Sequence, residues 1–295
     1  NNGYGIYAGA GLVIAGPISM NINVEAGYDV YGIYCDNDEN DGIVDICEGA
    51  QLAVNARSSY EYEEDDVETY RPVGIYAEGA NIFISGQNTR VTAVADGYHS
   101  TAIYADTGDV FIEDAAVEAV AKGFDYNSDE VDDYSAAIEG NYVEICGDAQ
   151  VKALLSGLGF AILAHDGDVL INSDDNGSAQ VTAAASGDGS NAIRAYQFGD
   201  GDIKINGSAV VDASQLGDVL LRYDIEGDWS DNVAALYADN VYIGGSARVT
   251  ATASGAGVNI SAEVISTQND PTGFDPGENY YPVAIYATVD IAISD

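Results

Sequence analysis

A four-residue pattern, Gly/Ala-Ile-Tyr-Ala, recurs with substitutions along the chain and constrains its fold more than any other feature. Its copies begin at Gly5, Gly32, Gly74, Ala102, Ala137, Ala161, Ala192, Ala235 and Ala284. Two further patterns follow most copies in a fixed order. These are apolar-x-Ile, as in Val110-Phe111-Ile112, and Val-x-Ala, as in Val117-Glu118-Ala119. A chain that repeats several patterns in one order is a stack of similar units.

Each pattern alternates apolar and other residues with a period of two, which is typical of a β-strand with one buried face. Gly, Asn, Asp and Ser bound these short runs, and no helical periodicity of useful length is present. Three short strands cannot bury their apolar faces alone, whereas stacked copies cover one another. The sequence therefore predicts an all-β fold, a parallel β-helix (solenoid) of about nine coils with three short strands per coil.

The handedness follows from the repeat length and from chain topology. The shortest unit, from Ile138 to Ile162, is longer than the period of about 18 residues of a left-handed hexapeptide helix. Parallel connections are right-handed in nearly all folds. We therefore predict the right-handed form, with 1–295 as a single domain.

Stacking at about 4.8 Å per coil places equivalent residues in ladders along the axis. We expect Ile ladders inside and a tyrosine ladder on the outside. The outer ladder contains Tyr7, Tyr34, Tyr76 and Tyr104, then Glu139, Leu163 and Arg194, and finally Tyr237 and Tyr286.

Four long insertions interrupt the repeat, at 57–72, 122–135, 214–233 and 254–282. Each lies between a third strand and the next first strand, so all four leave the solenoid at one edge, beside the tyrosine ladder. Insertions on one edge of a repeat protein commonly build its binding face.

The insertions combine aromatic rings with carboxylates, the groups that stack on a sugar ring and accept hydrogen bonds from its hydroxyls. The alternative is solvated loops whose aromatic side chains pack back on the solenoid. With the outer ladder, they give the candidate carbohydrate-binding residues Tyr34, Tyr76, Tyr104, Tyr62, Tyr70, Tyr126, Tyr134 and Trp229.

The formal charge of −40, from 49 acids and 9 bases, predicts repulsion of nucleic acid and of anionic lipid and attraction of cations. Solubility or a salty medium is the alternative explanation. No run reaches the roughly 20 apolar residues of a membrane span. The chain begins Asn1-Asn2-Gly3 and shows no capping element, so we expect a trimmed or mature segment of a larger protein.

The segment from 37 to 48 has oxygen-bearing residues at the spacing of a calcium loop, although no flanking helices are predicted and an EF-hand is excluded. A turn-bound Ca²⁺ is one interpretation, and an acidic turn is the other. The candidate ligands are Asn37, Glu39, Asp41, Asp45 and Glu48.

Evidence for catalysis is weak in the sequence. Acidic pairs are unavoidable among 49 acids, and the two histidines share no motif with a nucleophile. A calcium-dependent polysaccharide lyase would need a basic residue near the metal, and only Arg194 and Lys204 interrupt the outer positions of the middle coils. We therefore expect a non-catalytic protein, with a lyase of the pectate-lyase-like class as an alternative.

The unit containing Ala235-Leu236, Val241-Tyr242-Ile243-Gly244-Gly245 and Val249-Thr250 resembles repeats of secreted or cell-surface bacterial right-handed β-helix proteins. It is also loosely similar to the bacterial carbohydrate-binding β-helix family. The resemblance covers fold-bearing positions of all nine coils and carries over no binding residue. It implies a secreted or cell-surface adhesin or module that binds a polysaccharide or a host or cell-surface glycan with Ca²⁺. A structural stalk of a larger surface protein is the alternative.

Overall fold

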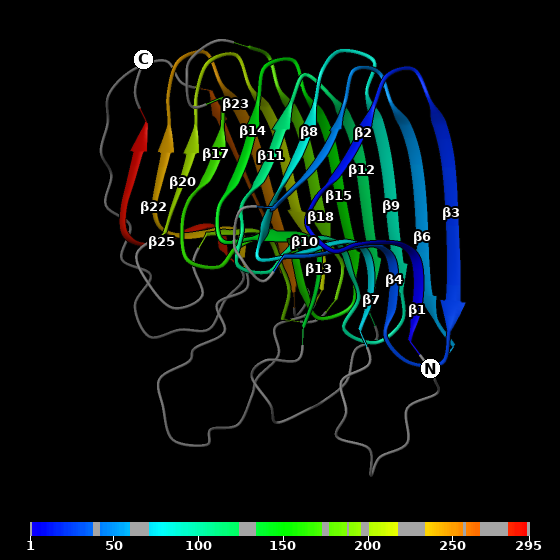
Figure 1. Ribbon diagram of the computed structural model, residues 1–295. Helices are drawn as coiled ribbons and strands as arrows, with labels where there is room; N and C mark the ends of the chain where they lie inside the picture. The colour runs from blue at the N-terminus through cyan, green and yellow to red at the C-terminus, as the bar shows by residue number, and fades with distance from the viewer. Residues whose placement is uncertain are drawn as a thin grey trace.

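The computed structural model describes residues 2–37, 42–59, 71–123, 134–172, 177–187, 189–195, 201–217, 234–255, 258–265 and 283–293. This part of the chain is all-β, with 25 strands and no helix. No segment of it could cross a membrane as a helix. The strands form two large, mostly parallel sheets, an arrangement consistent with a parallel β-solenoid (Figure 1).

The first pattern of each repeat forms one ladder of parallel strands. It consists of β1 (Gly3–Ala8), β4 (Val30–Asp36), β7 (Pro72–Glu78), β10 (Thr101–Ala105), β13 (Ser135–Gly140), β16 (Gly159–Ala164), β19 (Asn191–Ala195), β22 (Ala234–Ile243) and β25 (Val283–Ile293). These strands run along the bottom of the view in Figure 1.

The second pattern forms a second ladder, which β22 and β25 join to the first. Its other members are β2 (Leu12–Ala15), β5 (Gly42–Cys47), β8 (Ala80–Ser85), β11 (Val110–Glu113), β14 (Val143–Cys146), β17 (Val169–Ile171) and β20 (Asp202–Ile205).

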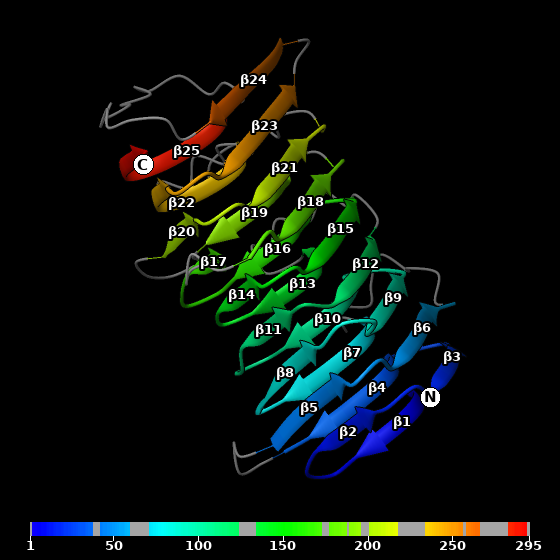
Figure 2. The same cartoon turned by 90° about the horizontal axis from the view of Figure 1, so that it is seen from above.

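The third pattern forms the nine-stranded sheet. It contains β3 (Ser19–Ala26), β6 (Gln51–Ser58), β9 (Arg90–Asp96), β12 (Ala116–Lys122), β15 (Gln150–Ser156), β18 (Gln180–Ala185), β21 (Val210–Gln215), β23 (Arg248–Gly255) and β24 (Val258–Ile265). Successive coils advance along a single axis in the view from above (Figure 2).

The predicted stacking of the first pattern is confirmed in every layer. Ile6 pairs with Ile33, Ile33 with Ile75, and Ile75 with Ile103. The series continues in register through Ile138, Ile162, Ile193, Leu236 and Ile285. From Ile33 to Leu236 these side chains are fully buried and form the centre of one continuous core.

The structure differs in two ways from the prediction of three separate strands in every coil. First, β22 and β25 each carry both the first and the second pattern. Gly79, with φ +64°, separates β7 from β8, whereas no residue with a positive φ interrupts β22. Second, β24 runs antiparallel to β23 and occupies the end position of the nine-stranded sheet. The sequence analysis found no capping element, and β24 pairs with the otherwise open edge of β23.

Facing residues of the first ladder and the nine-stranded sheet change in size along the axis. A Cβ atom built on Gly32 would lie 2.0 Å from Val54 Cγ1, whereas one on Gly74 would lie 3.4 Å from the Cβ of Ala93. Later coils have Ala at both positions, as at Ala102 and Ala119. A small residue therefore faces a large one in the first coils, and two alanines face each other afterwards.

We expect Gly32→Ala to destabilise the protein by about 1–3 kcal/mol, because the added methyl overpacks the core against Val54 and also lies 2.6 Å from the Gly74 carbonyl oxygen. The double variant Gly32→Ala/Val54→Ala recreates the pairing of the later coils and should recover part of this loss. Urea denaturation of the two variants and of Val54→Ala measures the coupling. If the losses in free energy of unfolding of the single variants simply add in the double variant, residues 32 and 54 do not compete for the same space in the core.

Corner residues hold successive coils together. The Asn81 Oδ1 atom accepts a hydrogen bond from the Asp109 backbone N–H at 2.8 Å, and Asp168 Oδ1 accepts one from the Asp202 N–H at 2.9 Å. Asx residues recur just before the second pattern, and this contact gives them a capping role at the corner.

Candidate functional site

The first two coils carry an array of four tyrosines on the outer side of the first ladder. Tyr4 stacks on Tyr31 and Tyr7 stacks on Tyr34, each pair with ring centroids 5.4 Å apart and nearly parallel planes. The two pairs meet edge to face, with the Tyr31 and Tyr34 centroids 4.8 Å apart. Offset-stacked and edge-to-face contacts are the preferred geometries of aromatic pairs. We call these four residues the tyrosine array.

The array is the most solvent-accessible aromatic surface among the described residues of the first ladder. Tyr7 is 57% exposed and Tyr4 is 44% exposed, whereas Tyr31 and Tyr34 are partly buried. Ile6 and Ile33 point into the core, so alternation places Tyr7 and Tyr34 on the outer side. Tyr4 and Tyr31 reach the same side because alternation is broken at Gly5 and Gly32, where an added Cβ atom would point inward at Ile22 and Val54.

Carboxylates line the array on its side toward the second ladder. The Tyr7 hydroxyl donates to Asp36 Oδ2 at 2.8 Å, and the Tyr34 hydroxyl donates to Glu78 Oε2. Each tyrosine thus reaches an acid of the next coil. Burial, and next the hydrogen bond to Glu78, raise the pKa of Tyr34. Burial and the nearby Asp29 raise the pKa of Tyr31 to about 12. The Tyr31 and Tyr34 hydroxyls therefore remain protonated donors near neutral pH.

The tyrosine ladder continues in the predicted register to Tyr76 and Tyr104. These two side chains are less exposed to solvent than Tyr4 and Tyr7. Tyr76 is partly buried, and Tyr104 is only 8% exposed. The guanidinium of Arg71 lies over the Tyr104 ring, 4.5 Å from its centroid. This cation–π contact occupies the face that a sugar would need. Tyr104 points out of the solenoid as predicted and packs under Arg71, and its contact with a carbohydrate stays a prediction.

Glu139 takes the next position of the ladder and is fully buried. Its Oε2 atom accepts hydrogen bonds from Arg71 Nη2 at 3.0 Å and from the Thr101 hydroxyl at 3.2 Å. Its Oε1 atom contacts the Tyr134 hydroxyl at 3.1 Å and His165 Nε2 at 2.6 Å. We call these five residues the Glu139 cluster.

The cluster holds the charge of Glu139 away from water, whereas the Arg71 side chain is 28% exposed. Burial alone would raise the pKa of Glu139, but Arg71 and the hydrogen bond from His165 outweigh it and hold this pKa below its ordinary value. Burial likewise opposes the charge of Arg71, and Glu139 more than compensates, so the pKa of Arg71 is raised. Four contacts use the acceptor positions of the carboxylate, which leaves Glu139 a structural role rather than that of a free acid or base.

The ladder positions of Leu163 and Arg194 are also covered. Leu163 is fully buried, and the Arg194 guanidinium lies 5.2 Å from the Phe160 ring centroid and 4.7 Å from that of Tyr237. The outer side of the first ladder is thus accessible at the first coils and buried in the middle ones.

Several predicted sugar-binding residues lie outside the described part of the chain. These are Tyr62, Tyr70, Tyr126 and Trp229. Tyr134 is described and belongs to the Glu139 cluster, where its hydroxyl contacts Glu139 and His165. Its role in binding a glycan stays a prediction.

Of the predicted calcium ligands, Glu39 and Asp41 lie outside the described residues. Asn37 is 8% exposed, and its Nδ2 atom donates to the Gly79 carbonyl at 3.3 Å. Asp45 lies on β5, and Glu48 follows the end of that strand. Asn37 packs beside Gly42 at the start of β5, and six residues of extended strand span about 20 Å. The structure therefore does not bring Asn37 and Glu48 together, although both occur in the predicted loop.

No group of three or more His, Cys, Asp or Glu side chains is arranged to hold a metal ion within the residues that the structure describes. The use of Ca²⁺ stays a prediction.

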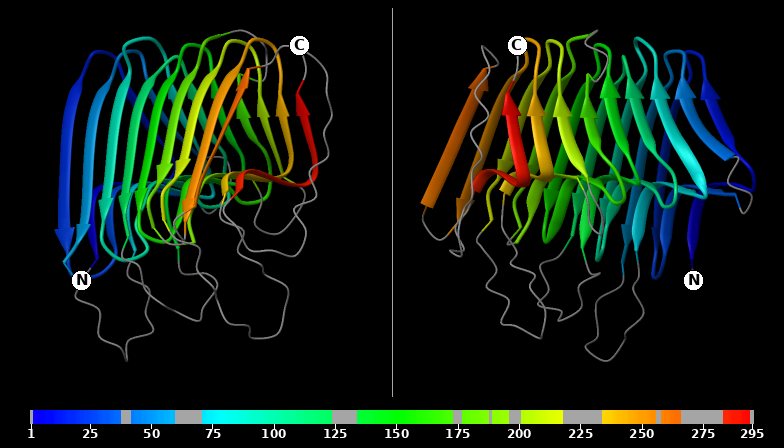
Figure 3. Two further views of the ribbon diagram at one scale, coloured as in Figure 1. Left: turned by 180° about the vertical axis from the view of Figure 1, so that it is seen from behind. Right: turned by 90° about the vertical axis from the view of Figure 1, so that its left-hand side faces the viewer.

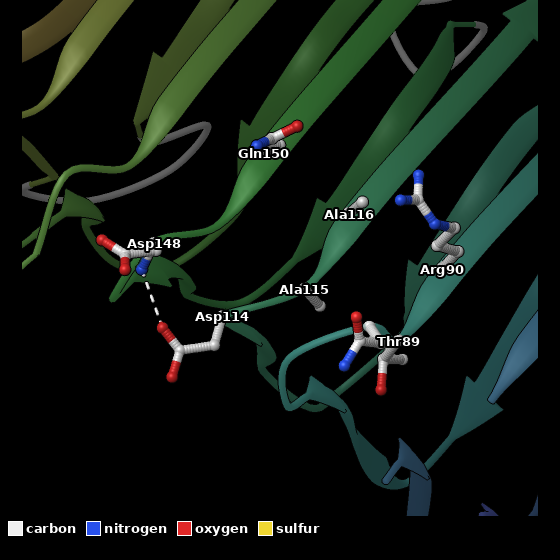
Figure 4. A pocket seen from close by; sticks show the side chains of 8 residues that line it. Thr89, Arg90, Asp114, Ala115, Ala116, Asp148 and Gln150 are labelled. Carbon is white, nitrogen blue, oxygen red and sulfur yellow. Dashed lines mark hydrogen bonds between the residues drawn. The ribbon is translucent and has the colours of Figure 1, made fainter. Parts of the chain in front are cut away.

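A shallow polar groove lies at the corner between the second and third ladders (Figure 4). Arg90 and Gln150 lie on one side of it, and Asp114 and Asp148 on the other. The Asp114 Oδ1 atom accepts the Asp148 backbone N–H at 2.8 Å, and Asp148 Oδ1 accepts the Ser178 hydroxyl at 2.8 Å. These carboxylates therefore cap the corners of successive coils.

Sequence reasoning missed Tyr4, Tyr31, Arg71 and His165. The first two lie three residues before Tyr7 and Tyr34, so strict alternation would place them on the opposite face of the strand. The signal that could have found them is the repeated Tyr-Gly-Ile-Tyr spacing of the first two coils. Nothing in the local sequence marks Arg71, because its partner Glu139 is two coils away.

Comparison of the chain with protein-family models, with curated proteins and with solved structures found no match.

Proposed function

We propose that this chain is a right-handed parallel β-helix module of a secreted or cell-surface protein, and that it binds a polysaccharide without catalysis. The observation that supports the proposal is the tyrosine array, an exposed aromatic surface bordered by Asp36 and Glu78. Aromatic rings bind the apolar face of a sugar, and carboxylates accept hydrogen bonds from its hydroxyls.

The array suits an extended ligand better than a single sugar. Its rings repeat at the spacing of the coils, and the hydroxyl donors and carboxylate acceptors repeat with them. A polymer that lies along the solenoid axis would meet the same ring edges and hydroxyls twice, because stacking covers the ring faces between the two coils. The charge of −40 favours neutral polysaccharides over anionic ones, unless Ca²⁺ bridges the carboxylates.

Substitution of the two most exposed rings tests the proposal. We expect Tyr4→Ala/Tyr7→Ala to weaken binding to the retained polysaccharide by roughly tenfold or more, since each lost stacking contact is worth about 1 kcal/mol. Affinity electrophoresis in gels that contain neutral plant or cell-wall polysaccharides measures the retardation, with Ca²⁺ and with a chelator.

The matched control is Phe83→Ala/Phe111→Ala, a stacked pair of partly buried rings on the second ladder, with centroids 4.8 Å apart. This variant should bind like the wild-type protein. Equal loss of binding in both variants would contradict a site at the tyrosine array. A chelator effect in the wild-type protein would support the Ca²⁺ interpretation.

A structural stalk is the second candidate, because the outer side of the first ladder is buried in the middle coils. Thr101, Glu139 and Leu163 are all inaccessible there. Absence of retardation on every polysaccharide would favour this role.

The lyase alternative has little support among the described basic residues. Lys204 contacts Asp168 at 2.6 Å and Asp202 at 3.0 Å, and Arg194 lies between two aromatic rings. Release of unsaturated sugars, detected by their near-ultraviolet absorbance, would establish a lyase.

A further inference from the structure

The outer face of the nine-stranded sheet has a charge unlike that of the rest of the chain. On strands β3 to β23 the outward side chains include five of the nine basic residues and four of the 49 acids. The bases are Arg57, Arg90, Lys122, Lys152 and Arg248, and the acids are Glu25, Asp96, Glu118 and Asp212. This face is therefore nearly neutral, and the charge of −40 is carried by the other surfaces. We call it the balanced face.

The charges of the balanced face alternate in sign where they are adjacent. Glu25, Arg57, Asp96 and Lys122 occupy one ladder position on consecutive strands, and Lys122 lies 3.4 Å from Asp96. In a second ladder, Lys152 Nζ lies 2.7 Å from Glu118 Oε1.

An aliphatic stripe crosses the middle of the same face. Val94, Val120, Leu154 and Ala184 follow one another in register on β9, β12, β15 and β18. Their side chains point outward and are partly buried, while their neighbours in sequence fill the core. The strands of this sheet lie side by side in Figure 3 (left).

We propose that the balanced face is a self-association surface, on which a second copy of this chain packs with its coils running in the opposite direction. The twofold axis lies in the interface, between β12 and β15. A second copy is the occupant that the charges favour, because contact through any other large surface would bring strongly negative faces together.

The residue pattern is self-complementary under this twofold rotation. It places Val120 opposite the partner's Leu154 and Val94 opposite the partner's Ala184, so that the stripe covers itself. It also places Glu118 opposite the partner's Lys152. Farther out, Asn55 meets the partner's Ser214, and no charged residue meets one of the same sign. An isologous interface requires this kind of self-matching.

The available area is that of a stable dimer. Eight strands at about 4.8 Å and six to eight residues each at about 3.3 Å give a face of roughly 750 Å². Standard interfaces bury about 800 Å² on each partner.

Sedimentation velocity of the intact chain tests the inference directly. We expect a concentration-dependent monomer–dimer equilibrium that shifts toward dimer as NaCl rises from about 50 to 300 mM, because salt screens the repulsion between two −40 bodies. A chain that stays monomeric at all salt concentrations would overturn the proposal.

Variants locate the contact. Leu154→Asp should abolish the dimer, whereas the control Leu170→Asp, at a partly buried outward position on β17, should leave it unchanged. Circular dichroism confirms the fold of both. A dimer that survives Leu154→Asp, or that Leu170→Asp disrupts equally, would refute the balanced face as the interface.

A charge swap gives a second readout that does not disturb the core. Lys152→Glu places a like charge opposite the partner's Glu118 and should weaken the dimer at least tenfold. The double variant Glu118→Lys/Lys152→Glu should restore it. Weakening that the swap does not restore would contradict the proposed antiparallel register. This test does not depend on polysaccharide binding.

Discussion

Glu139→Leu is expected to lower the free energy of unfolding by about 1.5–3 kcal/mol, the typical contribution of hydrogen bonds to a charged group, because the Arg71 side chain is 28% exposed and keeps access to water. The leucine itself should fit, because Leu163 fills the same ladder position one coil later and is fully buried. The loss comes from Arg71, whose Nη2 atom would keep only the Thr101 hydroxyl as a partner, and from the Tyr134 and His165 contacts that also disappear.

A double-mutant cycle separates the ion pair from simple packing. Arg71→Leu/Glu139→Leu removes both charges, and we expect it to recover most of the stability lost in Glu139→Leu. Glu118→Leu is the matched control, because it breaks an exposed pair worth about 1 kcal/mol or less. Urea denaturation supplies the free energies. If Glu139→Leu costs no more than Glu118→Leu, the cluster does not stabilise the fold.

The stabilisation by Glu139 should also depend on pH, and the direction of that change is a second test of the ion pair. The pKa of Glu139 is lower in the folded protein than its ordinary value of 4.5. Its stabilisation is therefore complete above that value and is lost as the pH falls through the lowered folded pKa. Protonation of the other acids relieves the repulsion of the −40 charge and acts in the opposite direction. Subtracting the double variant from the wild type removes this common effect, and the difference should shrink below pH 4.5.

The sequence was sufficient to predict how the coils stack, but not which side chains cover one another on the outer surface. The isoleucine ladder could be predicted because a period of two decides which residues face the core, and a slip by one residue would expose every one of them. The same alternation correctly placed Tyr104 on the outer side. It could not show that Arg71 covers the Tyr104 ring, since that contact joins residues 33 positions apart.

The breaks in the tyrosine ladder coincide with covered positions on the outer side of the first ladder. Glu139, Leu163 and Arg194 differ in polarity, yet each lies at a covered position: Glu139 in an ion pair, Leu163 out of contact with water, and Arg194 between two rings. A surface ladder that changes residue type in consecutive coils indicates that other segments pack on it. The uninterrupted tyrosines, in contrast, mark the end of the ladder that includes the exposed array.

Ile103→Ala is expected to cost about 2–5 kcal/mol, because it leaves a cavity in the middle of a continuous stack. Ile103 is fully buried, with Ile75 and Ile138 in the adjacent layers. In a solenoid each coil is stabilised mainly by its two neighbours, so one cavity weakens two interfaces between coils. Ile6→Ala is the matched control, since Ile6 is only partly buried and should cost about 1 kcal/mol. Urea denaturation compares the two variants, and equal losses at Ile103 and Ile6 would mean that layer-by-layer stacking is not what holds the coils together.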